Sequence, residues 1–240
     1  MANLIIDIGN TSLKAAWAEE STIGKIFRYQ GERIINFILS LTSKVKPEVL
    51  IISSKKELSN SNIEKLKKNC KYFILLDNNT DLYKKYEVPS YINSDRLATI
   101  IAAKKIFNNK DSIIFDFGTT LTIDIISKNG EYLGGNISLG CRTRFLAINR
   151  YSNNLPLLNT PDEILNKGNS INSSIESGVI SGIIFEIEGY LRGNSQKLVI
   201  FTGGDAIYFA KRMKNSIFVV CNLVLIGLAI IADNYEKSNK

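Results

Sequence analysis

Two segments of the chain carry the same combination of aspartate, glycine and threonine. Residues 4–11 read LIIDIGNT and residues 113–120 read IIFDFGTT, so each is an apolar run that ends in Asp-x-Gly-polar-Thr. A glycine beside a short polar residue lets backbone N–H groups approach a ligand closely, and such amide arrays bind phosphate. A carboxylate beside bound phosphates typically holds Mg²⁺, directly or through water. The two segments therefore predict a phosphate and metal site with Asp7 and Asp116 as candidate carboxylates.

A single Asp-Gly turn after an apolar strand usually does no more than close a β-hairpin. Both copies are followed at once by a second apolar or alternating segment, residues 13–17 and 121–126, so each predicts a hairpin. The repetition favours a functional interpretation, because each copy opens about half of the chain. It predicts a duplicated domain, residues 1–110 and 111–240, with two turns that could face each other across a cleft.

A third glycine turn, Thr202-Gly203-Gly204-Asp205-Ala206, lies between an apolar strand and a predicted helix. Adjacent glycines permit close packing of a flat ligand or of the helix itself, so this turn alone is weak evidence for a ligand site. It supports such a site only as one of three glycine turns. Gly135 and Gly140 have the spacing of a P-loop, but Cys141 and Arg142 stand where Lys and Ser or Thr are required, and no GxGxxG occurs. Walker-type and Rossmann-type nucleotide binding are therefore disfavoured.

The absence of histidine from the sequence narrows the chemistry further. Ser-His-Asp and Cys-His nucleophiles, histidine-ligated zinc and imidazole bases are excluded, so a general base is expected to be a carboxylate. Cys70, Cys141 and Cys221 lie far apart without a CxxC pair. This spacing argues against a disulfide framework or a zinc site and fits a reducing, cytoplasmic location.

Length and composition are those of an ordinary folded protein. The 240 residues suffice for one large or two small domains, and 45% hydrophobic with 22% charged residues excludes wholesale disorder and coiled coils. The net charge of +7 suits an anionic ligand or nucleic acid, but it also follows from a Lys-, Asn- and Ile-rich composition. Without a basic helix, aromatic platform or finger motif, no specific nucleic-acid partner is expected.

No membrane partner and no signal peptide are expected either. The longest apolar run, residues 217–232, is interrupted by Asn222 and Gly227 and is shorter than the ~20 residues that span a bilayer. Met1 leads directly into an apolar strand without a preceding basic segment.

Apolar runs that alternate with helical patterns predict an α/β fold. Strands are expected near residues 3–8, 13–18, 22–29, 49–53, 72–76, 112–117, 121–127, 131–137, 197–201 and 217–220. Helices are expected near residues 32–41, 59–69, 94–108, 142–149, 173–192, 204–213 and 222–236. The segment Ser94-Asp95-Arg96 begins one of these helices. In a first helical turn an acid is ordinarily favoured by the helix dipole, and Asp95 with Arg96 would ordinarily form a solvated ion pair.

In order along nearly the whole chain, these motifs resemble the type III pantothenate kinases of the acetate and sugar kinase, Hsp70 and actin superfamily. The matching motifs are Asp7-x-Gly9-Asn10-Thr11-x-x-Lys14, Tyr86-x-x-Pro89, Asp95-Arg96, Asp116-x-Gly118-Thr119-x-x-Thr122-x-Asp124, Gly134-Gly135-x-Ile137, Thr202-Gly203-Gly204-Asp205-Ala206 and Leu223-x-Leu225-x-Gly227-Leu228. The first motif alone indicates only the superfamily. The combination with Tyr86 and Asp95-Arg96 is specific to the pantothenate enzymes.

The resemblance implies a duplicated ribonuclease-H-like fold, as in actin-like ATPases, with mixed sheets and ATP bound in a cleft between the halves. It implies that ATP and Mg²⁺ are held through Asp7, Gly9, Asn10, Thr11, Lys14, Thr119, Gly203 and Gly204. It further implies that Asp116 helps to place a monovalent cation, K⁺ or NH₄⁺. The pantothenate pocket would be lined by Tyr86, Ser94, Asp95 and Arg96, with Asp95 as proton acceptor.

The implied activity is ATP-dependent phosphorylation of pantothenate, the first step of coenzyme A synthesis, in a cytoplasmic homodimer. Phosphoryl transfer needs in-line positioning, charge neutralisation and a residue that deprotonates the attacking hydroxyl, and an aspartate suits a protein without histidine. Arg96 could bind the substrate carboxylate or only pair with Asp95. The alternatives are a superfamily kinase or phosphatase for another small molecule, and a non-catalytic nucleotide-binding regulatory relative.

Four positions depart from the family pattern that the resemblance implies. Asn93 replaces a glycine two residues before Asp95, Leu139 replaces a proline, and Thr120 replaces an alanine. Ile171 stands where the family carries a threonine that reaches the partner subunit's pantothenate, and the neighbouring Ser170 could supply that hydroxyl. These changes bear on substrate affinity more than on ATP binding. The small-residue helix expected over residues 177–187 is the candidate dimer contact, or equally a helix buried within one subunit.

Overall fold

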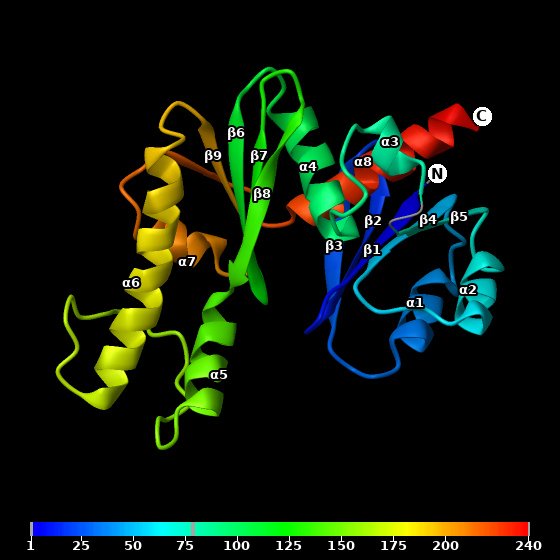
Figure 1. The fold of residues 1–240 in the computed structure, drawn as a ribbon. Coiled ribbons are helices and arrows are strands. Elements are labelled where there is room, and N and C mark those ends of the chain that lie inside the picture. The colour runs from blue at the N-terminus through cyan, green and yellow to red at the C-terminus, as the bar shows by residue number, and fades with distance from the viewer. Residues whose placement is uncertain (1, 78–79, 240) are drawn as a thin grey trace. The chain divides into compact units, whose positions relative to one another are not determined.

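Strand pairing divides the protein into two parts. The computed structural model describes residues 2–77 and 80–239, and within them ten strands form two five-stranded sheets (Figure 1). Each sheet belongs to its own compact unit. The first unit comprises Met1–Asn108 with Asn222–Lys240, and the second comprises Asn109–Cys221.

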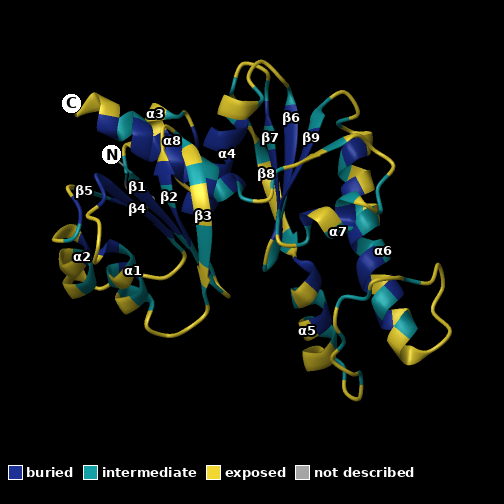
Figure 2. Cartoon of the chain, turned by 180° about the vertical axis from the view of Figure 1, so that it is seen from behind, coloured by how far each residue is buried: buried dark blue, intermediate teal, exposed yellow. Residues whose placement is uncertain are grey.

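The sheet of the first unit mixes parallel and antiparallel pairs. Its strands are β1 (Asn3–Ile8), β2 (Leu13–Glu19), β3 (Thr22–Tyr29), β4 (Val49–Ser54) and β5 (Tyr72–Leu76), in the spatial order β3-β2-β1-β4-β5. Strand β1 is antiparallel to β2 and parallel to β4. Both β1 and β4 are almost wholly buried, as their near-continuous apolar sequences predict for central strands (Figure 2).

Helices cover both faces of this sheet. They are α1 (Ile34–Thr42), α2 (Asn60–Lys67), α3 (Leu82–Lys85), α4 (Ser94–Ile106) and α8 (Leu223–Ser238). Side chains alternate between the two faces of a strand. The even-numbered Leu4 and Ile6 therefore join one apolar core with Ile38 of α1 and Leu66 of α2, and the opposite face of the sheet packs against α8.

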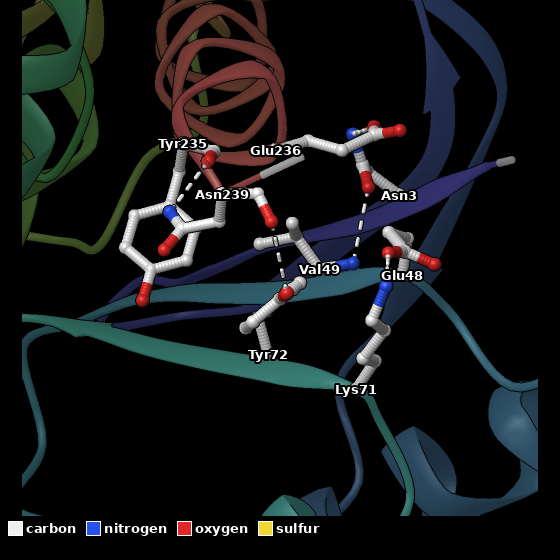
Figure 3. Close-up of polar contacts among 8 residues, drawn as sticks. All are labelled: Asn3, Glu48, Val49, Lys71, Tyr72, Tyr235, Glu236 and Asn239. Atoms are coloured by element: carbon white, nitrogen blue, oxygen red, sulfur yellow. Dashed lines mark hydrogen bonds and ion pairs between the residues drawn. The ribbon is translucent and has the colours of Figure 1, made fainter.

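Polar contacts fix α8 on the sheet although it is distant in sequence from the strands it covers. Asn3 of β1 donates from its side-chain nitrogen to Glu236 of α8 at 3.2 Å, and its side-chain oxygen accepts from the backbone N–H of Val49 at 3.0 Å (Figure 3). The Tyr72 hydroxyl of β5 donates to the Asn239 carbonyl just beyond α8 at 3.4 Å. Asn3 is buried and bonded on both sides, so these contacts specify how α8 lies across β1, β4 and β5.

The second unit repeats this arrangement. Its strands are β6 (Ser112–Phe117), β7 (Thr120–Ile126), β8 (Tyr132–Leu139), β9 (Leu198–Gly203) and β10 (Ile217–Val219), in the order β10-β9-β6-β7-β8. Its helices are α5 (Cys141–Tyr151), α6 (Ile171–Arg192) and α7 (Ala206–Ala210). All three contribute to one aromatic-rich core in which Phe115 and Phe117 pack against Phe201.

The duplication inferred from the sequence echo is visible in the topology. In each unit the strand that ends in Asp-x-Gly is central, antiparallel to the strand after it and parallel to a later one. Both Asp-Gly turns close hairpins, as predicted. All ten expected strands and all seven expected helices are present, with ends shifted by a few residues, and the short helix α3 was not expected.

The two compact units are not two contiguous halves that meet near residue 110. The C-terminal helix α8 follows the second unit in sequence but packs on the sheet of the first. Its apolar residues and Gly227 gave no information about which sheet they would cover. The division into an N-terminal half, residues 1–110, and a C-terminal half, residues 111–240, stays a prediction, and the compact units are those given above.

None of the helices among the described residues is long and apolar enough to cross a membrane. Residues 217–232 instead form β10 and most of α8, separated by a turn.

Gly227 allows α8 to contact α4 closely. A Cβ atom built on Gly227 would lie 1.9 Å from the backbone oxygen of Ala98 on α4, too close for any adjustment of a side chain to relieve. We expect Gly227→Ala to lower the free energy of unfolding by ~1–3 kcal/mol or more, since about 1–3 kcal/mol is the usual range for an overpacked core. Thermal or denaturant unfolding measures this change.

Gly189→Ala is the matched control, since Gly189 lies on α6 and an added Cβ there meets nothing within 4 Å. That variant should be neutral or more stable by up to ~1 kcal/mol, from helix propensity alone. Equal stabilities of the two variants would contradict the close α4–α8 contact.

Candidate functional site

The turn between β1 and β2 is narrow and polar. The Gly9 N–H donates to the Ser12 carbonyl at 3.1 Å, which closes the turn, and Asn10 and Thr11 project into solvent. An added Cβ on Gly9 would lie 3.2 Å from the Ser12 oxygen, so a larger residue would strain the turn. The predicted phosphate-binding residues of this segment therefore form one exposed turn with accessible backbone.

Asp7 lies at the centre of a row of polar residues across three strands. Its register partner on β2 is Lys14, and its register partner on β4 is Ser53. Paired residues of neighbouring strands project from the same face of a sheet. The structure thus brings the predicted Asp7 and Lys14 together, on the face of the sheet that carries α4 and α8.

The start of helix α4 lies against the end of β4. Asn93 precedes the helix in an extended conformation, with φ −63° and ψ 154°, so the left-handed geometry that a glycine would permit is not used here. The hydroxyls of Ser94 and Ser53 are 2.8 Å apart and form a buried hydrogen bond. This contact connects the predicted Ser94 to the same polar row that contains Asp7.

Asp95 is buried, with 9% of its surface exposed, and both of its carboxylate oxygens have partners. Oδ1 accepts a hydrogen bond from the Arg96 backbone N–H at 3.0 Å, and Oδ2 lies 2.8 Å from Nζ of Lys55. The Arg96 side chain is itself buried and the first turn of α4 is apolar beyond it. Asp95 is therefore not the solvated capping acid that its position in sequence would also allow.

Two partners at this site were not identified from the sequence. Ser53 and Lys55 belong to the segment Ile52-Ser53-Ser54-Lys55, which reads as the end of an ordinary buried strand. The signal available was positional: residues just after parallel strands β1 and β4 gather at one edge of the sheet. Only the tertiary structure shows that α4 begins at the same edge.

Tyr83 of α3 supports the segment that leads into α4. Its buried hydroxyl donates to the Ile92 carbonyl at 2.7 Å. Burial, with a smaller contribution from the negative charge of Asp95, raises the pKa of Tyr83 to about 12. The phenol therefore stays protonated and remains a hydrogen-bond donor across the physiological pH range, which fixes residue 92 immediately before the predicted substrate residues.

Tyr86 is held by a different set of contacts. Its hydroxyl accepts from the Asn234 side chain of α8 at 3.0 Å, and its carbonyl accepts from Nζ of Lys104 at 2.8 Å. Burial lowers the pKa of Lys104. Among the residues that the structure describes, the Tyr86 hydroxyl bonds to α8 and not to Asp95, so the structure places these two predicted pocket residues in the same unit without a direct bond.

In the second unit, Asp116 occupies the position that corresponds to Asp7. It lies at the centre of a row in which Thr122 of β7 and Thr202 of β9 are its register partners. The two threonines are buried. The row is therefore a set of oxygen atoms on three adjacent strands, next to the predicted Gly203 and Gly204.

Gly203 has a backbone conformation that other residues rarely adopt, with φ +92°. A Cβ atom there would lie 2.4 Å from the Phe117 oxygen and 2.5 Å from Oδ1 of Asp116. The Gly204 N–H donates to the same Phe117 oxygen at 2.8 Å. The predicted glycines thus lie directly against the predicted carboxylate.

Thr119 lies in the turn between β6 and β7, and its backbone connects that turn to α5. Its carbonyl accepts from the Gly140 N–H at 3.1 Å and from the Thr143 hydroxyl at 2.6 Å. Both bonds are made by the Thr119 carbonyl, so the side chain takes no part in them.

Burial raises the pKa of Asp205, the residue that follows Gly204.

The remaining departures from the family pattern lie in the second unit. Leu139 ends β8 opposite Thr120, so the strand extends through the position expected to be a proline-containing loop. Ile171 is the first residue of α6 and is 60% exposed. The Ser170 hydroxyl accepts from the Ser173 backbone N–H as the helix cap, which gives that hydroxyl a structural partner within the chain.

The described residues contain no group of three or more Asp, Glu, Cys or His side chains that could hold a metal ion. Mg²⁺ is usually bound by one or two carboxylates together with water and nucleotide phosphate. At Asp116 the neighbouring Thr122 hydroxyl oxygen is buried and has no hydrogen-bond partner among the described residues. That oxygen and the Asp116 carboxylate are hard oxygen donors of the kind a monovalent cation accepts.

The predicted site residues therefore form two groups. The first unit holds Asp7, Gly9, Asn10, Thr11, Lys14, Tyr86, Ser94, Asp95 and Arg96, and the second unit holds Asp116, Thr119, Gly203 and Gly204.

Solved structures identify the fold class. The chain is similar, with a TM-score of 0.65 and 22% identity, to the conserved putative Baf family transcriptional activator from Campylobacter jejuni, covering 99% of this chain and 100% of that one. It is also similar, with a TM-score of 0.61 and 13% identity, to the activator of 2-hydroxyisocaproyl-CoA dehydratase from Clostridium difficile with bound ADPNP, covering 100% and 97% of the two chains. The MreB5 protein of Spiroplasma citri bound to ADP matches with a TM-score of 0.55 and 13% identity over 99% and 98%. These similarities confirm the expected duplicated ribonuclease-H-like, actin-like ATPase fold.

Sequence comparison identifies the family within this class. The type III pantothenate kinase model matches residues 3–193. A type III pantothenate kinase of Azobacteroides pseudotrichonymphae genomovar. CFP2 is 36% identical over 230 residues, 94% of each chain, and one of Flavobacterium psychrophilum is 37% identical over 234 residues, 94% of this chain and 96% of that one. The chain belongs to the type III pantothenate kinase family.

The geometry at Gly203 predicts that no side chain is tolerated there. We expect Gly203→Ala to lower the free energy of unfolding by ~1–3 kcal/mol, because it combines an unfavourable positive φ with three contacts below 3 Å. The measurement is thermal unfolding of the two variants Gly203→Ala and Gly204→Ala. In Gly204→Ala the new Cβ would be 3.9 Å from its nearest neighbour, so its melting temperature should stay close to that of the wild type. A stable Gly203→Ala protein would show that the β9 turn can rearrange.

Proposed function

We propose that the protein phosphorylates the primary hydroxyl of pantothenate with the γ-phosphate of ATP, forming 4'-phosphopantothenate in the first step of coenzyme A synthesis. The observation that carries this proposal is family membership, with relatives named as type III pantothenate kinases that match nearly the whole chain. The actin-like ATPase fold supports ATP as the phosphate donor.

Asp95 is the proposed proton acceptor. Phosphoryl transfer requires that the attacking hydroxyl be oriented and lose its proton as the bond to phosphorus forms. The buried Asp95 carboxylate is fixed by two contacts, yet a carboxylate offers about four acceptor directions, so it retains capacity for the substrate hydroxyl. Ser94, Arg96 and Tyr86 are the proposed pantothenate residues, with Arg96 either binding the substrate carboxylate or pairing with Asp95.

The turn after β1 is the proposed phosphate site. Backbone N–H groups from Gly9 to Thr11 would bind phosphate oxygens, and Lys14 beside Asp7 would neutralise their charge. In the second unit, Thr119, Gly203 and Gly204 are the proposed contacts with the nucleotide. Each of these assignments rests on the family motif and on the local geometry of its own unit.

Two ions belong to the proposal. Asp7 would hold Mg²⁺, directly or through a water molecule. Asp116 with its neighbouring threonine oxygens would hold K⁺ or NH₄⁺. When bound, these ions would supply positive charge to the phosphates during transfer. The residues of this chain would contribute the oxygen ligands and keep the carboxylates in place.

A cytoplasmic homodimer is the proposed form of the enzyme. The residues 177–187 of α6 that were expected to form a dimer contact are mixed in exposure: Ile180, Ile183 and Ile187 are buried in the second unit, and Phe185 is 66% exposed. Phe185 on the outward side of α6 supports a contact with a second copy of the chain, whereas the buried isoleucines belong to the core of one subunit.

Release of ADP by the purified protein tests the activity. With ATP and Mg²⁺, we expect turnover that depends on added pantothenate and is much faster in K⁺ or NH₄⁺ than in Na⁺, because the proposed Asp116 site would select the cation. ATP binding without pantothenate-dependent turnover in any salt would contradict the kinase activity and favour the regulatory alternative. Pantothenate-dependent turnover that is equal in all salts would contradict only the cation site.

Replacement of Asp95 by Asn tests the proposed base. We expect kcat for pantothenate phosphorylation to fall by about 10²–10⁴, the usual contribution of a general base, while ATP affinity is largely kept. Steady-state kinetics and nucleotide titration measure these quantities. Asp81→Asn, which changes an exposed acid at the start of α3, is the control and should behave as the wild type. Wild-type kcat in Asp95→Asn would remove Asp95 from the base role.

A further inference from the structure

Lys55 is the one side chain that forms an ion pair with Asp95 among the described residues. Its Nζ lies 2.8 Å from Oδ2 of Asp95, and its side chain is 27% exposed. Lys55 follows the last residue of β4, belongs to no motif quoted for the family, and comes from a sequence segment that carries no signal for catalysis. From this contact we propose that Lys55 is a positioning residue that holds the Asp95 carboxylate for reaction; the inference rests on the proposed kinase function.

The backbone of Lys55 is fixed independently of its side chain. Its N–H donates to the carbonyl of Ile8, the last residue of β1, at 3.1 Å. Ile8 directly precedes Gly9, where the proposed phosphate turn begins. Lys55 therefore has its backbone bonded next to the phosphate turn and its side chain bonded to the proposed base, so it sets the distance between these two parts of the first unit.

A second contact from the same strand end supports this geometry. Ser53 belongs to β4, and Lys55 follows the last residue of that strand. The Ser53 hydroxyl bonds to Ser94, and the Lys55 ammonium bonds to Asp95, its sequence neighbour. Two successive residues at the start of α4 are thus attached to two alternate residues at the end of β4.

The contacts of Asp95 leave a defined role for Lys55. Oδ1 accepts from the Arg96 backbone N–H, which fixes one oxygen but still permits the carboxylate plane to rotate about it. The ammonium on Oδ2 removes that freedom. Misplacement of a catalytic group by about 1 Å can cost on the order of 10²-fold in rate. Because Asp95 is buried, loss of Lys55 also leaves its carboxylate without an ion-pair partner and should lower stability. Thermal unfolding of each variant separates this loss of stability from the loss of kcat.

Kinetics of Lys55→Met test the proposal with ATP, Mg²⁺ and pantothenate. We expect kcat to fall by roughly 10- to 100-fold, with the KM values for ATP and pantothenate changed by less than about threefold. Lys55→Arg keeps a cationic donor and should recover most of the lost kcat, which a purely steric role for the side chain would not explain. Lys55→Gln serves as a second neutral variant if Lys55→Met folds poorly, as judged by thermal unfolding.

Lys56→Met is the matched control. Lys56 is the next residue, is exposed, and forms no ion pair within the described part of the chain, so its replacement should leave kcat and both KM values unchanged. This variant removes the same charge from the same loop without touching Asp95.

Each other result overturns the proposal in a distinct way. Wild-type kcat in the neutral variants would show that Asp95 does not need Lys55. An increase in the KM for pantothenate alone would make Lys55 a substrate ligand, and an equal loss in Lys55→Arg would exclude the charge as the cause. If the wild-type protein itself shows no pantothenate-dependent turnover, the proposed function fails together with this inference, whereas normal wild-type turnover confines the failure to Lys55.

Discussion

The parallel pairing of β1 with β4 is the constraint on which the first unit depends. It places the end of β1, where the Asp-Gly turn begins, beside the end of β4, and it is maintained by strands that are almost fully buried. Burial of such apolar strands is the dominant favourable term in folding, so the register is strongly specified. Asp7, Ser53 and Lys55 are then brought to one sheet edge by backbone pairing, before any polar contact among them contributes.

Helices α4 and α8 add a layer to this edge that strand pairing alone cannot provide. Gly227 permits their close contact, and the buried Asn3 attaches α8 to both central strands. With α8 fixed, α4 begins at the end of β4, and its first residues meet Ser53 and Lys55. The position of the proposed base therefore depends on a C-terminal helix that follows the second unit in the sequence.

The second unit uses the same strand order for a different local chemistry. Asp116 corresponds to Asp7, but its register neighbours are threonines, where Asp7 has Lys14 and Ser53. Gly203 lies against Asp116 so closely that a Cβ cannot be accommodated. A duplicated scaffold thus presents a cationic neighbour in one copy and neutral oxygen atoms in the other, which supports the proposed phosphate site in the first unit and the proposed cation site in the second.

The sequence by itself determined the two hairpins, the duplication, the identity of the strands and helices, and the candidate residues Asp7, Asp95 and Asp116. The hairpins, the duplication, the strands and helices, Asp7 and Asp116 follow from local patterns: apolar runs, turn glycines and repeated motifs. Asp95 became a candidate only through the resemblance to the type III pantothenate kinases. The tertiary structure decided which sheet α8 covers, that Asn93 is extended, and that Asp95 is paired with Lys55. Periodicity shows only that a helix has an apolar face, and Lys55 lies 40 residues before Asp95, so their contact depends on long-range packing that no local pattern encodes.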